Sequence, residues 1–159
     1  MQRLNDLIGR SIPWLTLGMV LVTFSVVVLR YLFERGWVWM QEIVLYMHAF
    51  TFLLASGYAL ARDAHVRVDI LYRPASPRRK AWVDLLGSLF LLVPTSLVLL
   101  YQSLPFVLAS WAVFEGSKDG GGVEAVFLLK TGIPLFCLLL LLQGLAIARR
   151  CIATLRERS

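Results

Sequence analysis

The ten residues ARDAHVRVDI, numbered 61 to 70, concentrate ionisable side chains directly after a long apolar run. They include Arg62, His65, Arg67 and Asp69. Such a mixture of acids and bases could transfer protons, bind an anionic group or form ion pairs. In an extended segment His65, Arg67 and Asp69 share one face, because successive side chains point to opposite sides. The segment is therefore a candidate active site, membrane-surface anchor or docking element.

The rest of the chain contains no familiar pattern of catalytic or metal-binding residues. Neither Gly-x-Ser-x-Gly nor His-Glu-x-x-His occurs, and Cys137 and Cys151 lack metal-ligand spacing. The histidines, His48 and His65, are 17 residues apart, about 25 Å along a continuous helix, so they cannot clamp one haem iron. His48 lies alone within an apolar run, and we interpret it as a packing or hydrogen-bonding residue. We expect no enzymatic activity and no cofactor.

The composition predicts an all-α integral membrane protein. Hydrophobic residues make up 58% of the chain and the mean hydropathy is +0.72, above the roughly 45–50% apolar content of soluble domains. Since lipid cannot satisfy a peptide backbone, each long apolar run should be a helix. We predict a single four-helix membrane domain over residues 1–159, with spans at about 11–30, 43–61, 84–114 and 128–148.

The third predicted span is too long for one upright crossing. Its uncharged residues would extend about 45 Å, against a hydrocarbon thickness of about 30 Å. We expect a tilt, a kink at Pro94 or Pro105, or an extension along the interface. Upstream of this span, Ser76 can cap a helix whose first residue is Pro77.

The distribution of Lys and Arg predicts cytoplasmic N- and C-termini. The two tails and the loop 62–83 together hold twelve of these cations: Arg3, Arg10, Arg62, Arg67, Arg73, Arg78, Arg79, Lys80, Arg149, Arg150, Arg156 and Arg158. The other two connections hold four: Arg30, Arg35, Lys118 and Lys130. This bias explains the net charge of +6 without nucleic-acid binding. The loop 115–122, rich in glycine, is predicted to be a flexible connection without apparent chemistry.

One spaced pattern resembles a known family. Trp39, Glu42 and Gly57 are followed by His-Val-Arg-Val-Asp at 65–69. The pattern resembles the DctQ-like small membrane subunit of TRAP (tripartite ATP-independent periplasmic) transporters, over essentially residues 8 to 150. The length and the four-span layout are also similar to that family. The His-Val-Arg-Val-Asp stretch is the specific part of the resemblance.

The resemblance implies a function in the bacterial inner membrane. The small subunit would brace a large, elevator-type membrane subunit that imports an organic acid, driven by a sodium gradient. A periplasmic binding protein would deliver the substrate, such as a dicarboxylate or a sugar acid like sialic acid, and could dock partly on the small subunit.

The polar residues then receive hypothetical roles. Glu42, at the start of the second span, would pair with Arg30, Arg35 or a partner's Arg, while Trp39 anchors the helix at the interface. Arg62, His65, Arg67 and Asp69 would form a polar clamp between spans, or onto partner loops or lipid phosphate. Ordinary boundary residues and a solvated basic face are the alternatives.

Two other functional classes stay open at this point. The chain could be an anchor or assembly subunit of an unrelated membrane complex, such as an oxidoreductase. It could also be a self-sufficient small transporter, although no acidic residue lies in the apolar run of any predicted span, which is 85–114 for the third. We interpret the segment at 61–70 as a structural and docking element rather than an active site.

Overall fold

The protein is built from long helices, seen here in a computed structural model that describes residues 2–62, 72 and 74–157. No strand occurs among these residues. The helices are α1 (Gln2–Leu32), α2 (Val38–Ala61), α4 (Pro77–Gly87), a π-helical segment η1 (Ser88–Leu92), α5 (Val93–Ala112) and α6 (Val126–Glu157). Four helical stretches are long and apolar enough to cross a membrane: Gly9–Leu32, Val38–Leu60, Pro77–Ala112 and Val126–Arg156. The predicted all-α, four-span class is confirmed.

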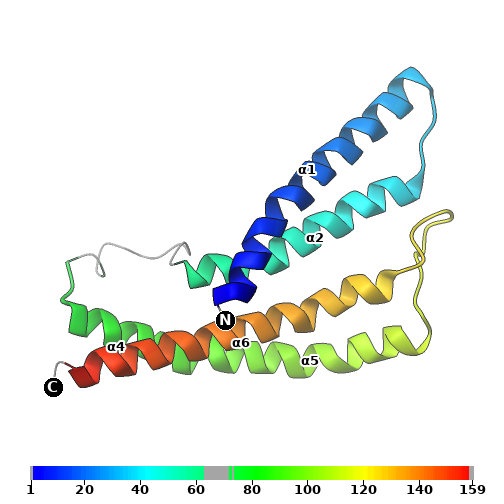
Figure 1. Ribbon diagram of the computed structural model, residues 1–159. Helices are drawn as coiled ribbons and strands as arrows, with labels where there is room; N and C mark the ends of the chain where they lie inside the picture. Colours follow the sequence, from blue (N-terminus) through cyan, green and yellow to red (C-terminus); the bar gives the residue numbers. More distant parts are fainter. Residues whose placement is uncertain (1, 63–71, 73, 158–159) are drawn as a thin grey trace.

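The helices form two antiparallel hairpins, joined where α2 lies against α6 (Figure 1). One hairpin is α1 with α2. In the other, α4, η1 and α5 run as one continuous rod beside α6. The α5–α6 connection lies at the same end of the molecule as the α1–α2 connection, and both chain ends lie towards the other end.

Small side chains line the contact between α5 and α6. Ser88, Ser96, Ser103 and Ser110 are all buried and recur every seven or eight residues, which places them on one helical face. Lipid tails are as apolar as leucine, so membrane helices associate through close packing, and small residues permit it. The second hairpin is therefore held together by small side chains along one helical face rather than by large buried side chains.

Gly57 of α2 makes a similar close approach to α6. A Cβ atom added there would lie 3.2 Å from Cβ of Leu139, tighter than an ordinary van der Waals contact. The small residue noted in the sequence therefore sits where the two hairpins meet.

The third span contains its irregularity at η1, which ends two residues before Pro94. Proline has no N–H, and its ring would clash with the carbonyl four residues earlier, that of Phe90. A π-helical turn widens the helix at this point. Pro105, the other expected kink site, lies inside regular α5.

The predicted start of α4 is confirmed. The Ser76 hydroxyl accepts a hydrogen bond from the Arg79 amide at 3.4 Å, and Pro77 occupies the first turn. The helices also extend beyond the predicted spans, because the hydropathy of 11–30 and 128–148 marks only the lipid-buried part of α1 and α6.

Candidate functional site

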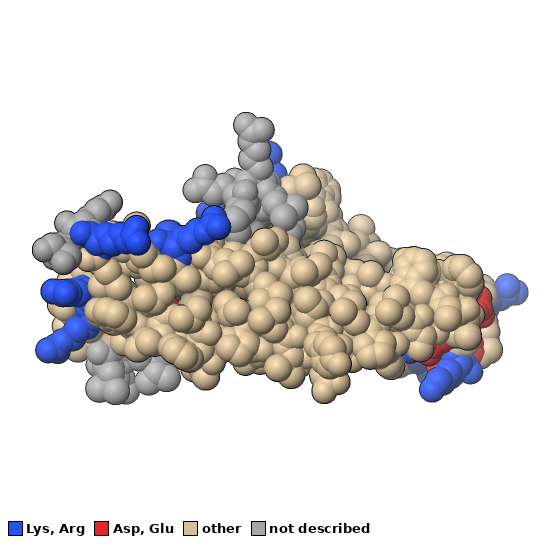
Figure 2. Space-filling model, turned by 90° about the horizontal axis from the view of Figure 1, so that it is seen from below, with Lys and Arg blue, Asp and Glu red and all other residues tan. Residues whose placement is uncertain are grey.

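Charged side chains gather at the two ends of the helices in the described part of the chain. Figure 2 shows Lys and Arg at both ends, with a broad band of other residues between them. We call the end formed by 33–37 and 113–125 the loop end. The end with Arg62, Arg78, Arg79, Lys80, Arg149 and Arg150 is called the basic end. A bilayer core of about 30 Å requires such a band.

At the loop end, α5 ends in a Schellman motif whose left-handed residue is Phe114. The Glu115 amide donates to the Ser110 carbonyl at 3.0 Å, and the Phe114 amide donates to the Trp111 carbonyl at 3.2 Å. Phe114 has φ of 45°, a conformation usually left to glycine. The left-handed conformation costs a non-glycine residue roughly 1–2 kcal/mol.

An aromatic cluster holds Phe114 in that conformation. Its ring packs edge to face against Trp111 and Phe127, with centroids 6.4 and 5.6 Å apart. Trp111 and Phe127 pack against each other at 4.7 Å, and the Trp111 indole donates to the Thr131 hydroxyl at 2.9 Å. Each aromatic pair contributes roughly 0.5–1.5 kcal/mol, so the cluster offsets the strain at Phe114.

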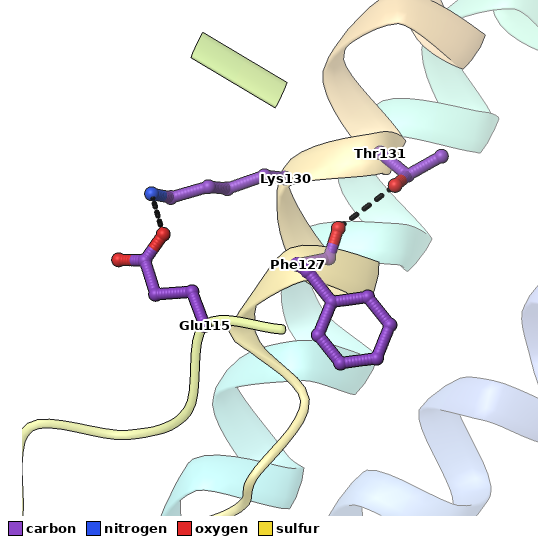
Figure 3. Close-up of polar contacts among 4 residues, drawn as sticks. All are labelled: Glu115, Phe127, Lys130 and Thr131. Atoms are coloured by element: carbon purple, nitrogen blue, oxygen red, sulfur yellow. Dashed lines mark hydrogen bonds and ion pairs between the residues drawn. The ribbon is translucent and has the colours of Figure 1, made fainter. Parts of the chain in front are cut away.

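This helix ending aims Glu115 at Lys130 of α6, and the two form an ion pair (Figure 3). The Lys130 ammonium also lies 4.0 Å from the centre of the Phe106 ring, close enough for a cation–π interaction. The hydrogen bond from Lys130 holds the pKa of Glu115 below its ordinary value of 4.5. The pair ties the end of α5 to the first turns of α6.

Glu42 joins the first hairpin to the α5–α6 connection. Its carboxylate accepts a hydrogen bond from the Ser117 hydroxyl and a second from the Val123 amide, the latter at 2.6 Å. Ser117 also accepts from the Asp119 amide at 3.1 Å. One carboxylate thus fixes both arms of the connection against α2, and we call Glu42, Ser117 and Val123 the loop-end clamp.

The glycines of this connection shape the clamp. The Gly122 amide donates to the Asp119 carbonyl at 3.0 Å, and Gly121 has φ of 79°, as the third residue of a type II turn requires. A Cβ atom on Gly122 would lie 2.3 Å from the Ser117 hydroxyl oxygen and 2.7 Å from a Glu42 carboxylate oxygen. The connection therefore does carry polar chemistry, contrary to the prediction from sequence.

The structure gives Glu42 partners that differ from the expected arginines. Helix α2 begins at Val38, so Glu42 lies beyond its first turn rather than at its first residues. Arg30 is exposed in the last turn of α1, and Arg35 is exposed in the connection that follows. Neither forms an ion pair with another described residue. Trp39 is exposed in the first turn of α2, a position compatible with interfacial anchoring.

Of the ionisable residues in the segment 61–70, Arg62 lies among the described residues. It caps α2, and its guanidinium lies 5.2 Å from the centre of the Tyr58 ring. His65, Arg67 and Asp69 lie outside the described residues, and so does the predicted clamp that they would form. His48 is exposed on α2.

Sequence reasoning missed Ser117 and Val123 because 75 and 81 residues separate them from Glu42. The available signal was chemical: a carboxylate at the edge of a span needs partners, and a glycine-rich loop offers backbone amides. Chemically, the clamp is a structural tie, with both carboxylate oxygens of Glu42 engaged. No cluster of potential metal ligands occurs among the described residues.

Comparison with known proteins agrees with this geometry. Residues 19–158 match the family described as "Tripartite ATP-independent periplasmic transporters, DctQ component". The chain is also 31% identical, over 94 residues, to the C4-dicarboxylate TRAP transporter small permease protein DctQ of Vibrio cholerae. That match covers 59% of this chain and 37% of the relative's own length. The family indicates a transporter component rather than an enzyme, in the multi-pass setting of a bacterial inner membrane. The chain belongs to the DctQ family of TRAP transporter small membrane subunits.

Proposed function

We propose that this chain braces the large membrane subunit of a TRAP transporter that imports an organic acid. The large subunit moves the substrate in an elevator-like motion driven by a sodium gradient, and a periplasmic protein delivers it. A C4-dicarboxylate is the first substrate to test, because the Vibrio cholerae relative is named for it. A sugar acid such as sialic acid is the second.

The placement of the polar contacts supports a bracing role. The clamp and the Glu115–Lys130 pair both tie helices together at the loop end. In each, the charged groups bind other groups of this same chain. A carrier of an organic anion would need cationic or donor groups near mid-membrane. The charged residues in the described spans lie near the ends of the helices instead.

The proposed orientation puts the basic end in the cytoplasm and the loop end in the periplasm. The support is the excess of Lys and Arg at the basic end, which follows the positive-inside rule. The clamp would then face the periplasm, where the binding protein docks. Attaching a reporter that is active only in the cytoplasm to the C-terminus tests this orientation, and an inactive reporter would refute it.

The test of function is recovery of the assembled complex. The tagged chain, extracted from its native membrane in mild detergent, should bring down a large polytopic protein, and that pair with the binding protein should take up a C4-dicarboxylate in proteoliposomes only with a sodium gradient. Recovery of redox subunits, or of this chain alone, would contradict the proposal.

A matched pair of variants tests the clamp within that complex. Glu42→Ala removes both clamp hydrogen bonds and should lower co-purification and uptake together. Glu124→Ala removes an exposed carboxylate from the same end and should leave both unchanged. If both variants co-purified with the complex and supported uptake to the same extent, the clamp would have no role in assembly.

A further inference from the structure

A cavity lies between α4 and α6 at the basic end, far from the clamp. Its volume is about 290 Å³, at the small end of the range for ligand pockets. Lys80, Ala81 and Asp84 line it from α4, and Ile147, Arg150 and Thr154 line it from α6. A site of this size suits the headgroup of a lipid rather than a whole lipid molecule.

Two cations face this cavity from opposite walls. Lys80 belongs to α4 and is half-buried, with its ammonium 5.2 Å from the centre of the Tyr72 ring. Arg150 belongs to α6 and is exposed. An ammonium and a guanidinium on facing helices form a site for a phosphate, which the guanidinium can bind through two hydrogen bonds.

The one acidic group of the lining is already engaged. Asp84 accepts a hydrogen bond from the Tyr72 hydroxyl at 2.7 Å and lies one helical turn deeper than Lys80. With one carboxylate against two cations, the lining keeps a positive charge. Arg78 and Arg79 lie in the same turn of α4 as Lys80, and Arg149 precedes Arg150 on α6, so they raise the local positive potential further.

The depth of the cavity matches the headgroup layer of a bilayer. Its charged lining lies at the level of the first turns of α4, and the uncharged stretch 85–114 begins directly after Asp84. Trp82, on the turn between them, is 48% exposed, as an interfacial tryptophan would be.

We propose that this cavity binds the phosphate of an anionic phospholipid, with Lys80 and Arg150 as its cationic ligands. The phosphate lies between α4 and α6, and the acyl chains extend from it into the membrane. The lipid thereby fastens the start of the third span to the end of the fourth. This site depends on membrane insertion alone and not on the identity of the transporter partners.

Native mass spectrometry of the full chain, with any subunit that co-purifies, measures the binding directly. The probes are phosphatidylglycerol, phosphatidylcholine and inorganic phosphate. Lys80→Gln with Arg150→Gln removes both cationic ligands. Arg78→Gln with Arg149→Gln is the matched control, since it removes the same charge from the same helices outside the cavity. Lys80→Arg with Arg150→Lys keeps the charge and controls for folding.

Each charge-assisted hydrogen bond that the cavity pair removes contributes about tenfold or more to binding, so we expect this pair to weaken phosphatidylglycerol binding by roughly 100-fold. The control pair loses only surface attraction, about fivefold for each cation, and should weaken binding by about 25-fold at most. The charge-keeping pair should weaken it by about fivefold or less. Phosphatidylcholine should bind more weakly than phosphatidylglycerol. Equal losses in the cavity and control pairs would reduce the site to general surface attraction and overturn the proposal. Displacement of the lipid by millimolar inorganic phosphate would overturn its assignment to a lipid.

Discussion

Replacing Gly122 with alanine should open the loop-end clamp, although Glu42, Ser117 and Val123 themselves stay unchanged. The new Cβ atom would lie 2.3 Å from the Ser117 hydroxyl oxygen, and 3.4 Å is the lower limit of ordinary contact. Ser117 must therefore retreat by about 1.1 Å, and the Glu42 carboxylate oxygen, at 2.7 Å, by about 0.7 Å. Ser117 belongs to the connection that also contains the Val123 amide, and the Glu42 carboxylate lies against it.

These displacements are large enough to break hydrogen bonds. The Val123 amide and the Glu42 carboxylate are 2.6 Å apart, and the bond weakens steeply once its distance and angle leave the usual range. A net hydrogen bond corresponds to a factor of roughly 2–10 in an equilibrium constant. Losing one or both bonds should raise the opening equilibrium of the connection by about that factor for each.

Hydrogen exchange read by mass spectrometry measures this opening, in the peptide that contains the Val123 amide. Gly120→Ala is the control, because a Cβ atom there meets nothing within 4 Å. By restricting the unfolded chain, that change should be neutral or stabilise by about 0.4–1 kcal/mol. Faster exchange is expected for Gly122→Ala alone. If both variants exchanged at the rate of the unaltered protein, Glu42 would not be held by the connection and the clamp would be refuted.

Three further predictions concern other contacts. Phe114→Ala and Phe114→Gly both lose the ring contacts, but only Phe114→Gly relieves the left-handed strain, so Phe114→Ala should unfold at the lower temperature; the reverse order would contradict strain at this position. Because the folded pKa of Glu115 is lowered, the Glu115–Lys130 pair should stabilise the protein above pH 4.5, and this contribution should fade as pH falls through the folded pKa. Thermal unfolding across this range should be flatter for Glu115→Gln, and an unchanged profile would count against the pair. Ser88→Ala removes a buried 2.7 Å hydrogen bond to the Gly144 carbonyl and should lower the free energy of unfolding, measured by SDS titration, by about 0.6 kcal/mol; no loss would contradict that contact.

The features that the sequence predicted correctly are those set by short stretches of chain. The Ser76 cap and the Pro77 start involve neighbouring residues, and each of the four apolar runs is long enough by itself to cross a bilayer. For the third span, the sequence predicts a tilt, a kink at Pro94 or Pro105, or an extension along the interface, and it does not choose among them. The choice involves packing, since Ser88 of the π-helical segment bonds to Gly144 of a different helix.

The candidate site was predicted less well for the same reason. Hydropathy gives the depth of Glu42 in the membrane but not which connection lies beside it. Arg30 and Arg35 were plausible partners because they are near in sequence and share the same side of the membrane. The glycine-rich loop indicates that backbone amides are available, but the sequence does not single out the amide of Val123, and only the fold brings it to Glu42.

The polar groups within the helices suggest how a brace differs from a carrier. On α5, the Ser96 hydroxyl donates to the Leu92 carbonyl at 2.7 Å, and the Ser103 hydroxyl donates to the Leu100 carbonyl at 3.0 Å. A hydroxyl satisfied by its own helix can be small and buried without offering a donor to a passing anion. The serines therefore serve close packing, and the charged residues serve ties between helices. If the proposed transport function is correct, substrate and sodium must bind in the large subunit, and changing Ser96 or Ser103 to alanine should leave the substrate KM unchanged. A shift in KM with assembly intact would place part of the substrate path in this chain.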